Sequence, residues 1–155
     1  MTTMADLDHS EYIDPMANDS QSKYQNELEF VVRDYECDLQ GVVNNANYLH
    51  YIEHARHQWL ESVGIDFAAL HEQGIDLIVV RIEIDYKYPL RSRDRFMVRS
   101  ALHREGRLKL ICSQDIYRKS DERLIAQTRV VTTALQNGRP ALPAPVIEKM
   151  EKILK

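Results

Sequence analysis

Residues 45–63 read NANYLHYIEHARHQWLESV, and this stretch decides the fold class. Its apolar residues recur every three or four positions, the spacing of one face of an α-helix. The apolar stripe consists of Tyr48, Ile52, Ala55 and Trp59, extended by Leu49 and Leu60. Gly64 follows as a stop signal. We therefore predict one long helix over residues 45–63, with a shorter helical stretch at residues 67–71.

The segments on both sides of this helix alternate between apolar and polar residues, as half-buried strands do. One such segment, residues 27–33, precedes the helix, and four follow it at residues 80–88, 96–102, 108–117 and 124–135. Short polar turns join the last three, and short turns require antiparallel neighbours. The pattern predicts an α+β fold: a curved antiparallel sheet of five strands wrapped around one long helix. A terminal helix is expected at residues 146–154.

Length and composition exclude several classes of protein. The 155 residues support one domain, which we place at residues 26–155. Residues 1–25 form an acidic tail that lacks the apolar core of a signal peptide, and we expect this tail to be flexible. Cys37 and Cys112 are too few for a disulfide framework, which favours a reducing, cytoplasmic location. The net charge of −4 argues against general nucleic-acid binding. No apolar run is long enough for a membrane span.

Residues 32–56, VRDYECDLQGVVNNANYLHYIEHAR, resemble the signature of the hotdog-fold acyl-CoA thioesterases, the 4-hydroxybenzoyl-CoA thioesterase-like superfamily. The matching elements are Asp38, Gly41-Val42-Val43, Asn47-Tyr48, Glu53 and Arg56. A second stretch, IEIDYKYPLRSRDRFMV at residues 82–98, also resembles the family, and the likeness covers residues 27–136. The resemblance implies hydrolysis of an acyl-CoA thioester without metal or cofactor. It also implies a homodimer or homotetramer with the active site between subunits.

The motif leaves the acyl carrier open. Asn45 stands where many relatives carry histidine or tyrosine, and Asn44-Asn45 is similar to the plant acyl-ACP thioesterases, whose upstream histidine is replaced here by Val42. An acyl-ACP thioesterase is therefore one alternative to an acyl-CoA thioesterase. A hotdog protein that binds acyl-CoA or a protein partner without catalysis is another.

Thioester hydrolysis needs a base or nucleophile near the carbonyl carbon and donors for the developing oxyanion. Asp38 lies in the loop before the long helix, whose first amides, around Val43 to Asn45, are expected to be free at the positive end of the helix dipole. Gly41 would allow the backbone to approach the substrate closely. We predict Asp38 as base or nucleophile and Asn45 as part of the catalytic site, with Gly41, Val43 and Asn44 contacting substrate. The alternative is that Asp38 only caps a turn or the helix.

Four further features have a structural and a functional interpretation. Glu53 is either a second catalytic carboxylate or an ion-pair partner of Arg56 or His57. Tyr48 belongs to the apolar stripe and is also a candidate substrate contact. Cys37 is a weak candidate nucleophile, because a neighbouring carboxylate raises a thiol pKa. The histidines of HYIEH at residues 50–54 match the spacing of a zinc peptidase motif, but exposed helix histidines are the ordinary explanation, and no metal site is predicted.

The densest basic cluster consists of Arg91, Arg93, Arg95 and Arg99. Arginine forks suit phosphate groups, so these residues are candidates for binding the phosphates of CoA, with Arg91 and Arg93 as the predicted contacts. The alternative is a solvated sheet edge that discourages strand pairing.

Overall fold

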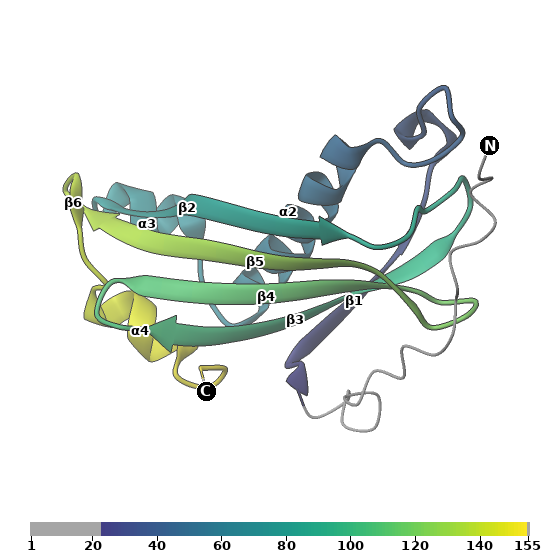
Figure 1. Ribbon diagram of the computed structural model, residues 1–155. Helices are drawn as coiled ribbons and strands as arrows, with labels where there is room; N and C mark the ends of the chain where they lie inside the picture. Colours follow the sequence, from purple (N-terminus) through teal and green to yellow (C-terminus); the bar gives the residue numbers. More distant parts are fainter. Residues whose placement is uncertain (1–22, 155) are drawn as a thin grey trace, which may run out of the picture.

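A computed structural model describes residues 23–154 and confirms a curled antiparallel sheet packed against one long helix (Figure 1). The strand order is β1-β3-β4-β5-β2, and every neighbouring pair is antiparallel. The strands are β1 (Asn26–Val31), β2 (Ile75–Tyr86), β3 (Arg95–Glu105), β4 (Lys109–Arg118) and β5 (Arg123–Gln136), and the two-residue β6 (Arg139–Pro140) pairs with β5. The helices are η1 (Asp34–Glu36, 3₁₀), α2 (Asn45–Ser62), α3 (Phe67–Glu72) and α4 (Ala144–Met150).

Helix α2 begins and ends at sequence signals that the chain carries locally. The Asn44 side chain accepts a hydrogen bond from the Ala46 amide at 2.9 Å, which satisfies one of the amides left free at a helix start. At the other end Val63 is the C-cap, and Gly64 adopts a φ of 92°, a conformation that favours glycine. The predicted helix is confirmed to within one residue.

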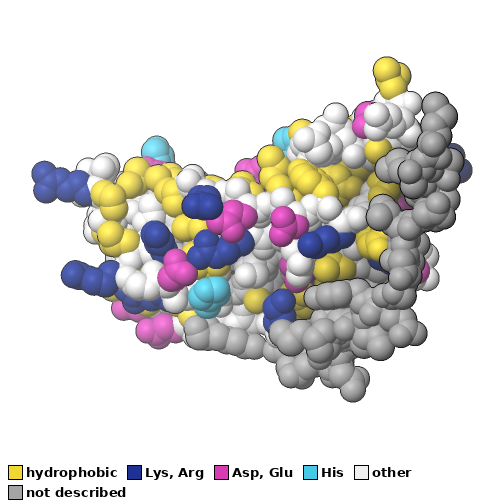
Figure 2. Space-filling model, viewed as in Figure 1, with side chains coloured by type: hydrophobic (Ala, Val, Ile, Leu, Met, Phe, Trp, Pro, Cys, Tyr) yellow, Lys and Arg dark blue, Asp and Glu magenta, His cyan; other side chains and the backbone are white. Residues whose placement is uncertain are grey.

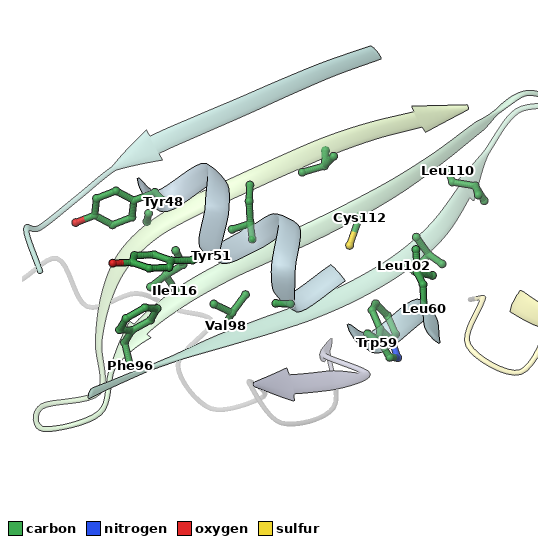
Figure 3. Close-up of a cluster of buried hydrophobic side chains, with 14 of the residues drawn as sticks. Tyr48, Tyr51, Trp59, Leu60, Phe96, Val98, Leu102, Leu110, Cys112 and Ile116 are labelled. Atoms are coloured by element: carbon green, nitrogen blue, oxygen red, sulfur yellow. The ribbon is translucent and has the colours of Figure 1, made fainter. Parts of the chain in front are cut away.

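The hydrophobic core lies between α2 and the inner face of the sheet (Figure 3). The apolar stripe of α2 is buried there, as predicted, against alternate residues of the central strands, except for Leu49, which is 39% exposed. Phe96 on β3 is fully buried and stacks on Phe30 of β1 at a centroid distance of 5.2 Å. Each fully buried side chain of this size contributes about 1.5–3 kcal/mol, so this interface is the main source of stability. The core residues that the strands contribute include Phe96, Val98, Leu102, Leu110, Cys112, Ile116 and Val130.

A polar network crosses this core under the middle of α2. Gln114 of β4 is fully buried, and its side-chain amide donates to the Ile52 carbonyl at 2.9 Å and to the Ser100 hydroxyl at 3.1 Å. Its side-chain oxygen accepts from the Arg56 guanidinium at 3.0 Å, and the Thr128 hydroxyl donates to its main-chain carbonyl at 2.8 Å. The contact to Ile52 joins the backbone of α2 directly to the sheet and fixes the position of the helix.

Two of the predicted boundaries are wrong. Strand β2 begins at Ile75, five residues before the predicted start at Val80, because residues 75–79, which are apolar apart from Asp76, continue the pairing with β5. The terminal helix covers residues 144–150 only, and Pro143 and Pro145 fix its start. Most of the predicted tail, residues 1–22, lies outside the described residues, whereas the Gln25 amide already donates to the Ser100 carbonyl at 2.8 Å.

The outer face of the sheet carries interspersed acidic and basic side chains (Figure 2). Several of them pair across strands, including Arg129 with Glu105 at 2.9 Å and Arg95 with Glu29 at 2.6 Å. Exposed pairs of this kind contribute little to stability, about 0–1 kcal/mol each. In residues 23–154 no helix is both long and apolar enough to cross a membrane.

Candidate active site at the start of helix α2

The loop between β1 and α2 folds into a narrow hairpin. Cys37 forms an isolated antiparallel bridge with Val43, and the Asp38 amide donates to the Val42 carbonyl at 2.9 Å. The tip closes with a hydrogen bond from the Gly41 amide to the Asp38 carbonyl at 3.0 Å, and Gly41 adopts a φ of 75°. A side chain is strained at that φ, so glycine here serves the turn. The hairpin holds Asp38 beside the start of α2.

Asp38 is half-buried and uses one of its two carboxylate oxygens within the turn. Its Oδ1 accepts from the Gln40 amide at 2.8 Å, whereas the helix itself is capped by Asn44. Among the contacts of residues 23–154, no hydrogen bond or ion pair engages Asp38 Oδ2. The capping interpretation is therefore correct for the turn and wrong for the helix. The second oxygen remains available to a water molecule or to a substrate.

The expectation that the amides of Val43 to Asn45 are all free is wrong for two of the three. The Val43 amide donates to the Leu90 carbonyl at 2.8 Å, and the Asn44 amide donates to the Glu36 carbonyl at 2.9 Å. These bonds attach the start of the helix to the loop that contains Leu90 and to η1 of the preceding connection, and the contact to Leu90 is a tertiary one that the local sequence does not reveal. The Asn45 amide has no acceptor within the described chain, so it is the donor that a ligand could use.

A hollow of about 230 Å³ opens beside this amide. The Tyr48 hydroxyl, which lines it, accepts from the buried Leu90 amide at 3.1 Å, and burial raises the pKa of Tyr48. The hydroxyl therefore keeps its proton at neutral pH, and no acceptor for that proton is present in the described part of the chain. The Tyr86 hydroxyl donates to the Asn45 carbonyl at 3.0 Å. The full lining is Val43, Asn45, Tyr48, Tyr86, Lys87, Tyr88 and Pro89.

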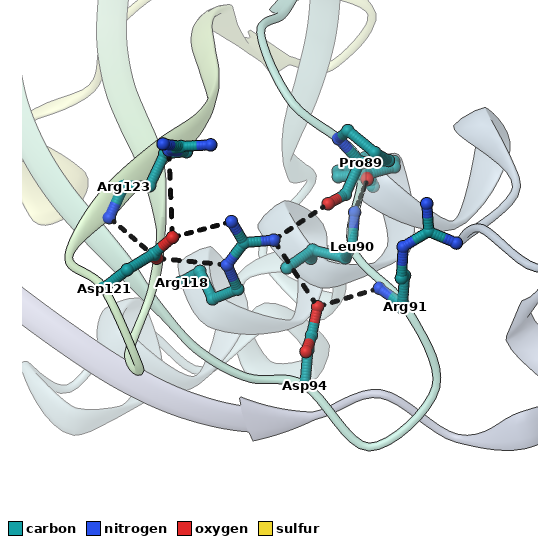
Figure 4. Close-up of polar contacts among 8 residues, drawn as sticks. Pro89, Leu90, Arg91, Asp94, Arg118, Asp121 and Arg123 are labelled. Atoms are coloured by element: carbon teal, nitrogen blue, oxygen red, sulfur yellow. Dashed lines mark hydrogen bonds and ion pairs between the residues drawn. The ribbon is translucent and has the colours of Figure 1, made fainter.

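The loop at residues 87–94, which forms one wall of the hollow, is held by Arg118 (Figure 4). Arg118 forms a two-pronged pair with Asp121, with distances of 3.0 and 2.7 Å, and donates to the Pro89 carbonyl at 3.4 Å. This pairing lowers the pKa of Asp121 to about 2. Asp94 accepts from the Arg91 amide at 2.9 Å. The loop thus has a defined shape before any ligand binds.

The basic cluster divides into two groups. Arg95 pairs with Glu29, and Arg99 contacts Glu27 and Glu122, so both are engaged on the outer face of the sheet. Arg91 and Arg93 are exposed, and no acidic side chain of residues 23–154 forms an ion pair with either guanidinium. Both follow the hollow-lining residues directly in sequence. The solvated-edge interpretation is therefore wrong for Arg95 and Arg99, because β3 lies between β1 and β4 inside the sheet. Arg91 and Arg93 keep the capacity to bind phosphate.

Glu53 is not brought to Asp38 within one protomer. It is exposed on α2, eight residues beyond Asn45, which is about 12 Å along the helix axis. The predicted pairing of Glu53 with Arg56 is wrong, because Arg56 points into the core and bonds to Gln114. Glu53 can join the site only from a partner protomer.

The histidines of α2 and the two cysteines complete the predicted candidates. His50, His54 and His57 are exposed, and His57 lies against Phe67 at a centroid distance of 4.8 Å. No group of three or more metal-ligating side chains occurs in the portion of the chain that the structure describes. Cys37 is half-buried, and burial raises the pKa of Cys112 to about 12, which makes that thiol unreactive.

Two groups of functional candidates were not predicted. Tyr86, Lys87 and Tyr88 line the hollow, although their sequence indicated only a strand. The family-like stretch at residues 82–98 was the one signal that pointed to this region. The buried position of Arg56 had no usable signal, because a charged residue beside an apolar stripe normally reaches solvent.

Comparison with known proteins places this architecture in a family. A model of the thioesterase-like superfamily matches residues 32–152. An acyl-acyl carrier protein thioesterase of Arabidopsis thaliana, ATL3, is 32% identical over 131 residues, 83% of this chain and 69% of that protein. The long-chain acyl-CoA thioesterase FadM of Escherichia coli is 29% identical over 80% of this chain and 96% of that protein.

Solved structures agree with the sequence comparison. The probable thioesterase YbaW of Escherichia coli superposes with a TM-score of 0.73 at 28% identity, over 84% of this chain and all of that one. A protein of Aquifex aeolicus superposes with a TM-score of 0.74 at 26% identity, over 81% of this chain and 98% of that one. The sheet, the long helix and the matched residues lead to one conclusion: the chain has the hotdog fold and belongs to the thioesterase-like superfamily.

Proposed function

We propose that this thioester hydrolase cleaves an acyl-CoA thioester to the free acid and CoA, with Asp38 as its essential carboxylate. The observation that carries the proposal is the half-buried Asp38, which has one engaged and one available oxygen and is held by a closed hairpin at the start of α2. The resemblance of the loop to the hotdog thioesterases and the relative named as an acyl-CoA thioesterase support the substrate class.

The chemistry can follow either of two balanced routes from this carboxylate. As a general base, Asp38 takes a proton from a water molecule whose oxygen attacks the carbonyl carbon; the C–S bond then breaks, and the proton passes to the departing sulfur. As a nucleophile, Asp38 forms an acyl–carboxylate anhydride with loss of CoA, which water then hydrolyses. In both routes negative charge develops on the carbonyl oxygen. We assign its stabilisation to the Asn45 amide and the protonated Tyr48 hydroxyl.

The decisive experiment replaces Asp38 with asparagine and measures thiol release from acyl-CoA. The amide oxygen of the variant still accepts from the Gln40 amide, so the turn is retained, but the amide is a poor base and nucleophile. We expect kcat to fall about a hundredfold or more, the size of effect typical for loss of a general base. Asp66→Asn is the matched control, because Asp66 Oδ1 caps α3 through the Ala69 amide at 3.0 Å, far from the loop in sequence.

Near-normal turnover by a folded Asp38→Asn protein would reject this mechanism and direct attention to Glu53. The same assay with a panel of acyl-CoA and acyl-ACP substrates tests the carrier. The acyl-ACP alternative is favoured by the plant relatives and by the Asn44-Asn45 pair. If no substrate releases thiol, the remaining alternative is a hotdog protein that binds acyl-CoA without catalysis.

We also propose a homodimer, or a tetramer built from it, paired through β2. Strand β2 is an edge of the sheet, is twelve residues long and exposes Val79, Val80 and Ile82 near its middle. Apolar residues at the centre of a free edge are what a two-fold, antiparallel strand pairing would bury.

A lysine in the middle of the edge tests this pairing. Light scattering of the wild-type protein should give at least twice the 18.1 kDa chain mass, and Val80→Lys should lower it to that of one chain. Val31→Lys is the control, since Val31 is 51% exposed on β1, the opposite edge. A monomeric wild-type protein would contradict the proposal.

The two unpaired cysteines support a reducing compartment, and we propose the cytoplasm.

A further inference from the structure

A second cavity lies under the C-terminal half of α2, between that helix, α3 and the sheet. Its volume is about 40 Å³, little more than the space of one water molecule in the liquid, about 30 Å³. Its wall is mainly apolar and includes Leu60, Leu77, Leu102, Leu110 and Met150. Only a single functional group, such as the end of an acyl group, fits a space of this size. Three polar side chains, Arg56, His57 and Thr132, interrupt the apolar wall, and of these His57 is exposed on α2.

Arg56 is a buried cation whose hydrogen-bonding capacity is mostly unused. Its side chain is 7% exposed, and the one hydrogen bond it makes within residues 23–154 goes to the neutral Gln114 side chain. No carboxylate of the described chain lies within ion-pair distance of it. A guanidinium has five N–H donors and stays charged in proteins, so at least three donors remain for another acceptor. Burying a charge without a partner is costly, which gives a bound oxygen acceptor a large advantage.

Gln114 cannot supply the further acceptors, or the negative charge, that the Arg56 guanidinium lacks. Its oxygen is already the acceptor for Arg56, and its amide group donates to the Ile52 carbonyl and the Ser100 hydroxyl. The fixed amide therefore orients the guanidinium without neutralising it. The other donors of Arg56 are left for the cavity that the side chain lines.

Thr132 supplies a second unmet polar group in the same wall. Its hydroxyl is buried and, among the buried side-chain nitrogen and oxygen atoms of the described residues, is the one left without a hydrogen-bond partner. Thr132 lies opposite Leu110 of β4 and Val79 of β2 in the sheet, and both of these residues also line the cavity. Unsatisfied buried polar groups are rare in folded proteins and require an explanation. The unpaired Thr132 hydroxyl and the unused donors of Arg56 line the same cavity, and together they indicate a ligand group with acceptor oxygens.

We propose that this cavity is a polar subsite, in which Arg56 and Thr132 bind an acceptor oxygen carried by the acyl group at a distance from the thioester. The inference rests on the proposed thioesterase function and deepens it, because it assigns the substrate class: oxygen-bearing acyl groups rather than plain hydrocarbon chains. A carboxylate, a keto oxygen and a hydroxyl share this chemistry. The carboxylate alone would also balance the charge of Arg56.

The test compares kcat/KM for pairs of acyl-CoA esters of equal length, one plain and one carrying a keto, hydroxyl or terminal carboxylate group at different positions. For at least one oxygenated ester, the wild-type protein should show a preference of about tenfold or more over its plain counterpart, the scale of a charged hydrogen bond. Arg56→Met should abolish that ratio. Arg129→Met, which removes an exposed arginine on the outer face, should leave both the ratio and the activity unchanged.

Thr132→Val provides a second variant in case Arg56→Met does not fold. It removes the unpaired hydroxyl at nearly constant shape, and we expect the preference for the oxygenated ester to fall severalfold. Thr133→Val is its neighbour control, because the Thr133 hydroxyl is already satisfied by the Leu108 carbonyl. A wild-type ratio near one for every pair, or a ratio that survives in Arg56→Met or in Thr132→Val, would overturn the subsite.

Thiol release separates this inference from the proposed function. Release from plain esters without any preference rejects the subsite and leaves the thioesterase in place. If no ester releases thiol, the proposed function fails. A thermal-shift measurement with the same CoA esters then tests whether the subsite binds the oxygenated acyl group. Stabilisation by the oxygenated ester alone, lost in Arg56→Met, would support the subsite, and equal stabilisation by both members of each pair would reject it.

Discussion

Replacing Tyr48 with phenylalanine removes a single oxygen atom from the junction between α2 and the wall of the hollow. That oxygen accepts the Leu90 amide at 3.1 Å, and Leu90 is completely buried, so water cannot replace the lost acceptor. The aromatic ring stays and keeps its contacts with Tyr51 and Tyr86. The change in stability therefore reports one unsatisfied amide.

Leaving a buried donor without a partner costs about 1–3 kcal/mol. For a chain of this length, 1 kcal/mol corresponds to a change in Tm of about 2–4 °C, so Tyr48→Phe should lower Tm by about 2–12 °C. Leu90 also accepts the Val43 amide, and a shifted Leu90 would displace the start of α2. We therefore expect a loss of kcat as well, which is enlarged if the Tyr48 proton binds the developing oxyanion.

Denaturant unfolding and thermal melts, with thiol release on the same preparations, measure both effects. Tyr86→Phe is the control for stability, because its hydroxyl donates to the Asn45 carbonyl at an exposed site and its loss can be replaced by water. It should change the free energy of unfolding by less than about 0.5 kcal/mol. If Tyr48→Phe were as stable as Tyr86→Phe, the buried hydrogen bond would not hold the loop, and our account of this junction would be incorrect.

Three further predictions concern charge, thiols and metal. Arg91→Gln and Arg93→Gln should each raise KM for acyl-CoA more than they lower kcat, because a phosphate contact far from the thioester stabilises bound substrate and transition state alike. Arg95→Gln is the control and should change neither constant, because Arg95 is already paired with Glu29. The difference should shrink at high salt, and unchanged KM in both variants would contradict phosphate binding. Ellman's reagent at pH 8 should label one thiol per native chain, at Cys37, and two in denaturant, because the pKa of Cys112, about 12, keeps it protonated. Exhaustive chelation should leave turnover intact; loss of activity restored by zinc would assign the helix histidines to the site.

Much of the fold could be predicted because its signals are local. The stripe of α2 and its stop at Gly64 depend on spacing within one segment, and the alternation of β3 predicts its buried residues correctly. The early start of β2 was missed for a related reason. Residues 75–79 are apolar apart from Asp76 and do not alternate strictly, and only pairing with β5, about 55 residues away, makes them a strand.

The site was predicted less completely because its contacts are not local. The position of Asp38 follows from a motif, whereas the partner of the Val43 amide, Leu90, comes from a loop far along the chain, and that of the Asn44 amide, Glu36, comes from η1 in the same connection. Arg56 illustrates the same limit. Helical spacing places it four residues after Ile52, at the border of the stripe, and nothing nearby reveals that Gln114, 58 residues later, receives its side chain in the core.

The hydrogen bond from Gln114 to the Ile52 carbonyl has a consequence for how the protein opens. It couples the backbone of α2 to β4 through a side chain that is fully buried, so the helix cannot separate from the sheet without breaking the contact of the same side chain to Arg56 as well. Amide hydrogens in the middle of α2 should therefore exchange with deuterium in the same cooperative step as those of central β4.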